Sequence, residues 1–500
     1  MKKITLFTYK RYMVLMPLMF ALLFSSCSKD YLDTNPTDQV ATADAFSTTK
    51  NAWAALNGIH RLLYSQFYSN QDQGGQSGNM IYMESLGEDL VMTGQSNGWY
   101  ITAYKWQTHR VATNKVPYYN YLFYYTIIGN ANMIIANVDK ADGPDADKKA
   151  IKGEALAYRA WAYHQMIQLF GIRYDAGATN ETPGLPLVLE PTTAATPRSS
   201  VAKVYLQINA DLNSAMGLLK DYKRANASHL NLNVAQGLKA RVALTQQNWD
   251  SAAYYAKVAR DGFALMSTTQ YTAGFNDYTN PEWIWGSHQV ADQTSYAYSF
   301  FAFMSANYNS TNIKTNPKAI FSKLYAQISA TDVRKQLWDS TGKNTAFPIP
   351  PSGTRKAYMN KKFLVVDQGS SIGDLPLMRS AEMYLIQAEA EARAGKTANA
   401  QATLYTLAVQ RDSKYKQSAR TGDDLIAEIL VQRRIELWGE GFRFYDLKRT
   451  NAALDRTGGN HDNGLTGGLM QVPAGDVRWQ FLIPQDEINN SNGVVTQNPL

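Results

Sequence analysis

The segment RRIELWGEGFRFYDLKRT, residues 433–450, holds eight charged and four aromatic side chains in eighteen positions. On a helix, Arg433, Glu436 and Glu440 are three and four residues apart and therefore share one face. Arg443 and Asp446 repeat the three-residue spacing. Charges of both signs interleaved with aromatic residues indicate a partly buried, paired seam, and not a basic patch for nucleic acid. We therefore interpret this segment as structural.

The pattern over most of the remaining chain is helical. In residues 151–171, apolar side chains recur every three or four positions, and we expect Gly171 to end this helix in a left-handed conformation. Pro376 fits the first turn of a helix better than its interior. Further helices are predicted at 46–65, 118–138, 201–219, 233–246, 249–264, 377–394, 399–411 and 423–438.

Two predicted helix pairs, residues 239–259 and 387–407, resemble each other. Both place a small residue twelve positions after another, at Ala240 and Ala252 in the first pair and at Ala388 and Ala400 in the second. Small residues at crossings let antiparallel helices approach closely, as in tetratricopeptide repeats. No tandem 34-residue period is visible. On this pattern alone, two unrelated amphipathic hairpins remain an equal alternative.

Two segments are irregular: residues 72–97 and residues 271–362, the latter with a possible helix at 319–328. Both are rich in Asn and other polar residues, with little helical period, and long irregular segments within a globular chain are often binding surface. Within the second, Trp283 and Trp285 alternate with Ile284 as in a strand, and we expect Trp283 to pack in the core.

The first 26 residues are predicted to be an export signal, with basic residues followed by a short apolar run. Its removal takes away four positive charges and no negative ones, so the net charge falls from +7 to +3. We therefore expect no nucleic-acid partner. Cys27, the only cysteine, follows a small-residue ending that is similar to a bacterial lipobox, and we expect it to carry a lipid. Residues 27–45 are interpreted as a polar tether, and 46–500 as a single domain.

Catalytic motifs lack support. Gly369–Gly373 fits G-x-S-x-G, but a nucleophile elbow needs a helix directly after the serine, and Pro376 lies in the way. The six histidines show no metal-ligand spacing, so no zinc site can be argued, and no P-loop or dinucleotide motif is present. We therefore expect neither an enzyme nor a cofactor, and a structural calcium ion cannot be derived.

Several motifs resemble one family. Residues 433–449 are similar to the C-terminal signature R-R-x-E-L-x-x-E-G-x-R-x-x-D-L-x-R of the SusD/RagB outer-membrane lipoproteins. GEALAYRAWAYHQMIQLFG (153–171) and LPLMRSAEMYLIQAEAEARAG (375–395) look like repeat helices of that family, and FLIPQDEINNSNGVVTQNPL (481–500) looks like its C-terminus. The resemblance runs from Cys27 to Leu500.

This resemblance implies a mainly α fold with about four tetratricopeptide-like helix pairs and a loop-rich ligand-binding region, in which 271–362 is an insertion. It also implies a non-catalytic, lipid-anchored, surface-exposed protein of the outer membrane. Such a protein captures oligosaccharides and delivers them to a SusC-like TonB-dependent transporter. Two alternatives stay open: a RagB-like peptide receptor on the same scaffold, and a helical scaffold for envelope assembly.

Sugar binding favours aromatic rings for stacking, together with amide donors and acceptors for the hydroxyls. The family motif fixes no single contact residue, so the regions 96–106 and 294–309 are predicted from this chemistry. For any one ring, packing in the core is an equal alternative. The predicted ligand-binding residues are Trp99, Tyr100, Tyr104, Trp106, Tyr296, Tyr298, Asn307 and Tyr308, with Asn309 beside them.

Overall fold

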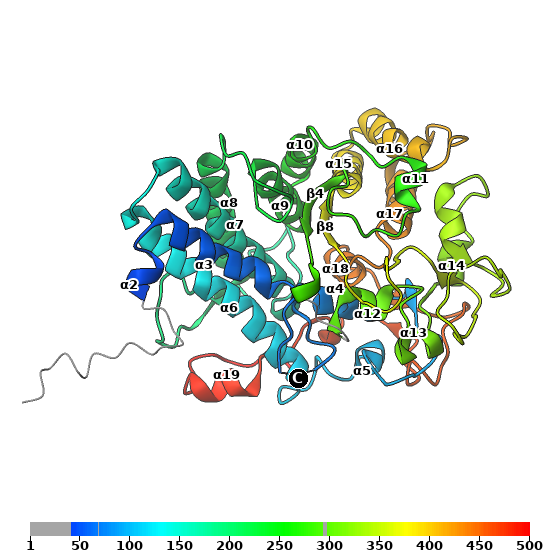
Figure 1. Cartoon of the computed structure of the whole chain (residues 1–500), viewed down its shortest axis with the longest axis horizontal. Helices are drawn as coiled ribbons and strands as arrows, with labels where there is room; N and C mark the ends of the chain where they lie inside the picture. Colours follow the sequence, from blue (N-terminus) through cyan, green and yellow to red (C-terminus); the bar gives the residue numbers. More distant parts are fainter. Residues whose placement is uncertain (1–41, 69, 294–297) are drawn as a thin grey trace, which may run out of the picture.

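Nine long helices form the scaffold of the protein, whose computed structural model describes residues 42–68, 70–293 and 298–500. Figure 1 shows them as a curved array that runs from the N-terminal helices to α15, α16 and α17. Their bounds are α3 (Thr49–Leu62), α6 (Lys115–Asn137), α7 (Asp145–Phe170), α8 (Val201–Leu218), α9 (Leu232–Thr245), α10 (Trp249–Ala259), α15 (Ser380–Arg393), α16 (Thr397–Arg411) and α17 (Gly422–Glu436).

The packing order of these helices is that of a repeat array. Four pairs, α3/α6, α7/α8, α9/α10 and α15/α16, each pack together, and the second helix of a pair packs against the first helix of the next. The first helices also contact one another in series, and α17 continues that series on α15. This arrangement confirms the predicted helical repeats.

The small residues predicted at helix crossings are buried there. Ala240 of α9 and Ala252 of α10 are fully buried, as are Ala388 of α15 and Ala400 of α16, and the two helices of each pair pack together. A methyl side chain at a crossing keeps the two backbones close, because any larger group would separate them. The two similar sequence patterns therefore mark two repeats of the same array.

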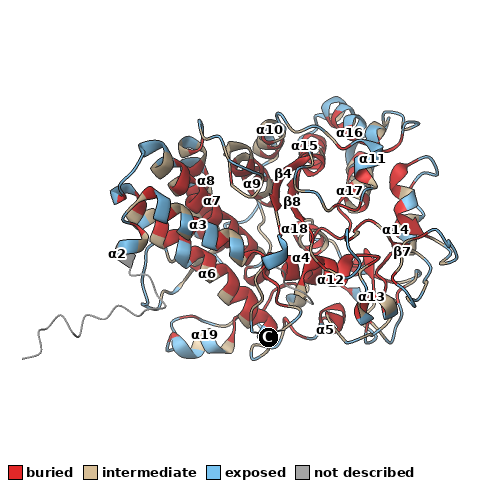
Figure 2. Ribbon diagram, in the orientation of Figure 1, coloured by how far each residue is buried: buried red, intermediate tan, exposed pale blue. Residues whose placement is uncertain are grey.

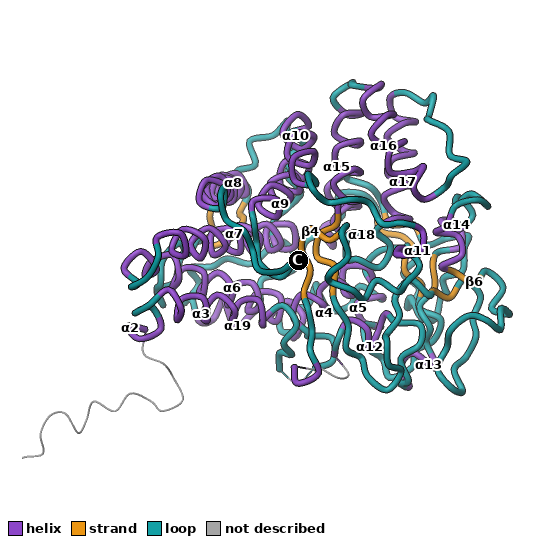
Figure 3. The backbone as a smooth tube through the Cα atoms, turned by 45° about the horizontal axis from the view of Figure 1, so that its top comes forward, coloured by secondary structure: helices purple, strands orange, loops and turns teal. Residues whose placement is uncertain are grey.

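Two insertions interrupt the array, one between α3 and α6 and one between α10 and α15. Figure 3 shows that the part of the molecule formed by these insertions consists largely of loops, together with short helices and strands. Its helices are α4 (Gly75–Ser85), α5 (Ile101–Tyr104), α11 (Thr268–Tyr271), α12 (Phe300–Met304), α13 (Thr311–Thr315) and α14 (Ser322–Tyr325). Elsewhere lie α2 (Thr42–Ala45), α18 (Arg443–Arg449) and α19 (Gln485–Asn490).

Short strands brace the insertions. The strands β1 (Leu90–Val91), β5 (Ala319–Ile320), β7 (Met359–Asn360) and β6 (Trp338–Asp339) form an antiparallel sheet in that order, with β1 from the first insertion and the others from the second. Three two-stranded sheets pair β4 (Trp283–Ser287) with β8 (Leu375–Arg379), β2 (Pro183–Pro186) with β3 (Arg198–Ser200), and β9 (Leu454–Asp455) with β10 (Gln471–Val472). Trp283 is buried in β4, as predicted from its alternation.

Three local predictions are wrong. Pro376 lies in β8 opposite Gly286, because that segment pairs with β4 before α15 begins. Residues 319–328 divide into β5 and the four-residue α14, because Ala319 and Ile320 pair with neighbouring strands of the sheet. Gly171 ends α7 with φ −89° and ψ 163°, in extended backbone, and its N–H still bonds to the Ile167 carbonyl.

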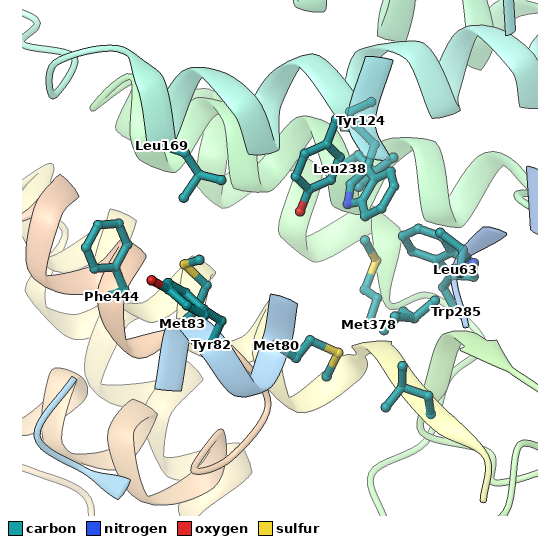
Figure 4. Close-up of a cluster of buried hydrophobic side chains, with 14 of the residues drawn as sticks. Leu63, Met80, Tyr82, Met83, Tyr124, Leu169, Leu238, Trp285, Met378 and Phe444 are labelled. Carbon is teal, nitrogen blue, oxygen red and sulfur yellow. The ribbon is translucent and has the colours of Figure 1, made fainter. Parts of the chain in front are cut away.

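The core runs through both halves of the molecule. Figure 2 shows buried residues on the inner faces of the repeat helices and along α4, α12 and β8. In Figure 4, α4 inserts Met80, Tyr82 and Met83 between the repeat helices and the C-terminal part of the chain. Among the described residues, no helix has the length and apolar character needed to cross a membrane.

The charged segment 433–450 is buried and paired, as its sequence predicts. Glu436 is fully buried and contacts the guanidinium groups of Arg411 (3.0 Å), Arg379 (3.2 Å) and Arg334 (3.3 Å). Glu440 contacts Lys362 and Arg379, each at 2.7 Å, with side-chain exposures of 3% or less. Burial alone would raise the pKa of Glu436, but the three guanidinium groups hold that pKa well below its ordinary value.

The second half of the segment ties α18 to other elements. Arg433 donates to Asp446 at 2.7 Å, and Arg449 donates to Asp446 at 2.8 Å and to both carboxylate oxygens of Glu389 at 2.7 Å. Burial opposes ionisation of Asp446, but Arg433 and Arg449 lower its pKa to about 2. Arg443 pairs with Glu88 of the first insertion. The segment therefore joins the end of the repeat array to the insertions.

Candidate functional site

The two regions predicted to bind ligand lie against each other. The Tyr100 and Phe303 rings meet edge to face, with centroids 4.6 Å apart. The side chain of Asn312 donates to Asn97 at 3.2 Å, and the hydroxyl of Thr315 donates to that of Ser96 at 2.7 Å. Residues 96–106 and 298–315 therefore pack against each other, although about 200 residues separate them in the sequence.

Three of the predicted aromatic residues are buried, with 2%, 0% and 5% of their surface exposed: Tyr100, Tyr104 and Trp106. The Tyr104 hydroxyl hydrogen-bonds to His461, and the Trp106 indole N–H donates to the Leu86 carbonyl at 2.9 Å. Burial raises the pKa of Tyr104 to about 12. A ring enclosed in this way has no exposed face on which a sugar could stack. Of the two alternatives, core packing and ligand contact, the structure therefore supports core packing for all three rings.

The remaining predicted residues divide differently. Asn307 is 9% exposed, and its side-chain amide bonds to both the N–H and the carbonyl of Val365, so it is used within the fold. Trp99, Tyr298 and Tyr308 are half-buried. Tyr296 lies outside the described residues.

We define the loop face as Asn97, Trp99, Tyr298, Tyr308 and Asn309. Asn97 and Asn309 are exposed, and the three rings are partly exposed. The rings of Trp99 and Tyr308 pack on the core, which fixes their positions while part of their surface faces solvent. Rings held in this way, flanked by amides, suit a ligand that has both apolar faces and hydroxyl groups.

The loop face rests on backbone that is locally strained. Ser96 and Tyr100 have φ of 46° and 60°, in the left-handed region that most residues avoid. Such conformations persist only where the surroundings fix them, and they gather at binding sites. Helix α4 and the residue before it pack against both parts of this region: a Cβ on Gly78 would lie 3.5 Å from the Tyr100 hydroxyl oxygen, and a Cβ on Gly74 would lie 2.2 Å from the Tyr298 carbonyl oxygen.

The G-x-S-x-G match is not a nucleophile elbow. Residues 369–373 form an irregular loop, with no strand directly before them and with β8, not a helix, after them. This agrees with the interpretation from Pro376.

The sequence offers no basis for a metal site, yet His60, Glu154 and His229 lie together with their candidate ligand atoms within 4.8 Å of one another. Their positions in the chain, 94 and 75 residues apart, carry no recognisable spacing.

Two family models match consecutive parts of the chain. The model of the SusD family matches residues 238–500, which is more than half of the chain. A model described as "Starch-binding associating with outer membrane" matches residues 30–244. Together they span the repeat helices, both insertions and the C-terminal segment.

Known proteins agree with these matches. The SusD-like protein P2 of Formosa agariphila is 24% identical over 75% of this chain and 79% of its own length. A SusD-like carbohydrate-binding protein from Bacteroides vulgatus has a TM-score of 0.79 and 25% identity over 90% of this chain and 97% of its own. A laminarin-binding SusD-like protein has a TM-score of 0.71 and 20% identity, covering 91% of this chain and 100% of its own. The chain described here belongs to the SusD family.

Proposed function

We propose that this protein is a non-catalytic, lipid-anchored receptor that captures oligosaccharides at the loop face and delivers them to a TonB-dependent transporter in the outer membrane. The observation that carries the proposal is the loop face itself: three partly exposed rings, two of them with an exposed asparagine within two residues in the sequence, in a SusD-family protein.

The compared proteins support a carbohydrate ligand. The family model for residues 30–244 is described as starch-binding, and similar folds include a laminarin-binding protein and a surface glycan-binding protein from Bacteroides fluxus. The chemistry agrees, because a sugar ring buries its apolar C–H face on an aromatic ring while its hydroxyls bond to amides. Trp99 supplies the largest such ring in the loop face.

Membrane attachment is proposed from the sequence and the family description. Cys27 lies outside the described residues, and its position after an apolar, basic-flanked segment supports lipidation. The family description names association with the outer membrane. The transporter partner and the surface exposure rest on the family resemblance.

Affinity electrophoresis against a panel of α- and β-glucans, with a peptide mixture measured in parallel by calorimetry, tests the ligand class. We expect retardation by at least one glucan and no heat from the peptides. Peptide binding without glycan binding would instead favour a peptide receptor, and binding of neither would favour an envelope scaffold.

Labelling cells with a radioactive fatty acid tests the anchor. We expect the label on the wild-type protein and none on Cys27→Ala, which should also leave the outer-membrane fraction. An unlabelled wild-type protein would contradict the proposed anchor without affecting the proposed ligand.

A further inference from the structure

Two histidines and one glutamate form a cluster that shares no residue with the loop face. His60 lies in the last turn of α3, Glu154 in the buried part of α7, and His229 in the loop before α9. The Glu154 side chain is fully buried, while those of His60 and His229 are 12% and 14% exposed. The cluster is therefore held by the fold, and its two imidazole side chains are slightly exposed.

His60 is oriented toward the carboxylate and lacks a partner there. Its Nδ1 bonds to the Tyr158 hydroxyl at 2.5 Å, which fixes the ring. Its buried Nε2 has no hydrogen-bond partner among the described residues and lies 3.7 Å from a Glu154 carboxylate oxygen. That distance is too long for a hydrogen bond. It is close to the separation of about 3.4 Å between two ligands of one tetrahedral zinc ion with bonds of about 2.0–2.1 Å.

The other contacts position Glu154 for the same role. The backbone N–H of Leu230 donates to one carboxylate oxygen at 2.9 Å, and His229 Nδ1 lies 3.0 Å from the other. Arg224, whose charge acts on this carboxylate, donates instead to the backbone carbonyls of His229 at 3.1 Å and Ile284 at 2.6 Å. Orientation of ligands by such outer contacts is typical of metal sites.

We propose that His60, Glu154 and His229 bind a divalent transition-metal ion, with Zn²⁺ as the ion that best fits two imidazoles and one carboxylate. Because the candidate ligand atoms all lie within 4.8 Å of one another, each side chain needs to move by less than about 1 Å to reach tetrahedral spacing. On binding, His229 would coordinate through Nδ1 as the tautomer that carries its proton on Nε2, so the Nδ1 proton passes to Nε2 through solvent and the contact with Glu154 is replaced by a bond to the metal. A water molecule would complete the coordination.

The bound ion would clamp α3 to α7 and to the loop before α9. This joins the first pair of the helical array to the second and third. The proposal is independent of the glycan-binding proposal, because none of its residues belongs to the loop face.

Calorimetric titration with ZnCl₂ tests the site, using the full chain with Cys27→Ser so that the only thiol does not compete. We expect one Zn²⁺ per chain, and no saturable binding in His60→Gln or His229→Gln. His288→Gln is the matched control, because His288 also pairs with a carboxylate, Asp374, at 2.7 Å outside the cluster, and it should bind like the parent.

Thermal unfolding and the visible absorption spectrum are two further measurements of metal binding, and they test the site even if one cluster variant is less stable than the parent. At a hundredfold excess of Zn²⁺ over its Kd, the parent Tm should rise by about 2–3 °C, and neither cluster variant should respond. Co²⁺ in place of Zn²⁺ should give visible absorption bands that the variants lack. No saturable binding in the parent, or equal binding in a folded cluster variant, would overturn the assignment of a metal site to this cluster.

Discussion

Glu436 is the residue on which three buried guanidinium groups converge, those of Arg334, Arg379 and Arg411. Replacing it with Gln leaves these cations buried with less compensating charge. We therefore expect Glu436→Gln to lower the free energy of unfolding by about 3–5 kcal/mol, measured by urea denaturation. Asp250→Asn breaks the exposed pair with Lys396 and should lower the free energy of unfolding far less, because solvent screens that pair. Equal effects of the two substitutions would contradict a buried network.

Glu84 should make stability depend on pH. Burial, with help from the Asp89 charge, raises its pKa to about 7, against 4.5 for the free side chain. One oxygen accepts from the N–H groups of Gly441 and Phe442, while the other is buried without a partner in the described chain, as suits a protonated acid. A raised pKa gives stability that is fully present below pH 4.5 and is lost as the pH rises through 7.

Glu84→Gln keeps the shape of the acid and removes this titration. We expect the variant to gain stability relative to wild type between about pH 5 and pH 8, by up to about 3 kcal/mol. Urea unfolding of both proteins at the two pH values measures the difference. A difference that stays constant with pH would show that Glu84 is ionised in the folded state.

For single residues, the sequence predicts that a charged side chain is buried and paired, but not which residue it pairs with. The spacing of Arg433, Glu436 and Glu440 predicts a shared, paired helix face. The three side chains are buried and paired, but α17 ends at Glu436, so Glu440 lies in the turn that follows and not on the same helix face. Two partners of Glu436 are Arg334 and Arg379, which lie 102 and 57 residues away and are brought near only by the tertiary fold. No local pattern specifies such long-range pairs.

Among the elements, the crossing of α15 and α16 depends on a small side chain. Ala400 is fully buried there, whereas Ala398, on the same helix, is exposed. Leucine at position 400 would force the helices apart, so we expect Ala400→Leu to cost about 1–3 kcal/mol in unfolding free energy. Ala398→Leu is the matched control and should change stability by no more than about 0.5 kcal/mol. A tolerated Ala400→Leu would mean that this crossing is loosely packed.

The long helices could be predicted because their apolar period persists over many residues. The errors fall where tertiary pairing overrides the local pattern: β8 takes residues 375–379, including Pro376, and β5 takes the start of the predicted helix 319–328. The alternation of Trp283 and Trp285 correctly predicts the strand β4. Short elements of two to five residues leave too weak a period to be separated from loops.

At the scale of the whole molecule, the two insertions meet because α10 and α15 pack directly, as consecutive repeat helices, while the chain between them loops out. Helix α4 of the first insertion then packs on α12 of the second, and the loop face forms where they join. The composition of the sequence indicates these two regions. Composition alone could not tell which of these rings would be exposed. Trp99 is half-buried, whereas Tyr100 and Trp106 are buried, because the left-handed turn at Tyr100 decides which ring points inward.

The organisation of residues 46–500 as one domain stays a prediction, as does the division into signal and tether before it. One cluster of buried apolar residues extends from Phe46 to Val495, and a smaller one lies between α15, α16 and α17.

The most direct test of glycan capture at the loop face is the affinity of Trp99→Ala for the glucan that binds wild type best, measured by isothermal titration calorimetry. We predict a Kd at least about tenfold weaker, equivalent to ~1.4 kcal/mol, with the Tm within about 2 °C of wild type. Tyr254→Ala, which removes a 60% exposed ring from α10, should bind like wild type. An unchanged Kd for a folded Trp99→Ala, or an equal loss in Tyr254→Ala, would contradict the account.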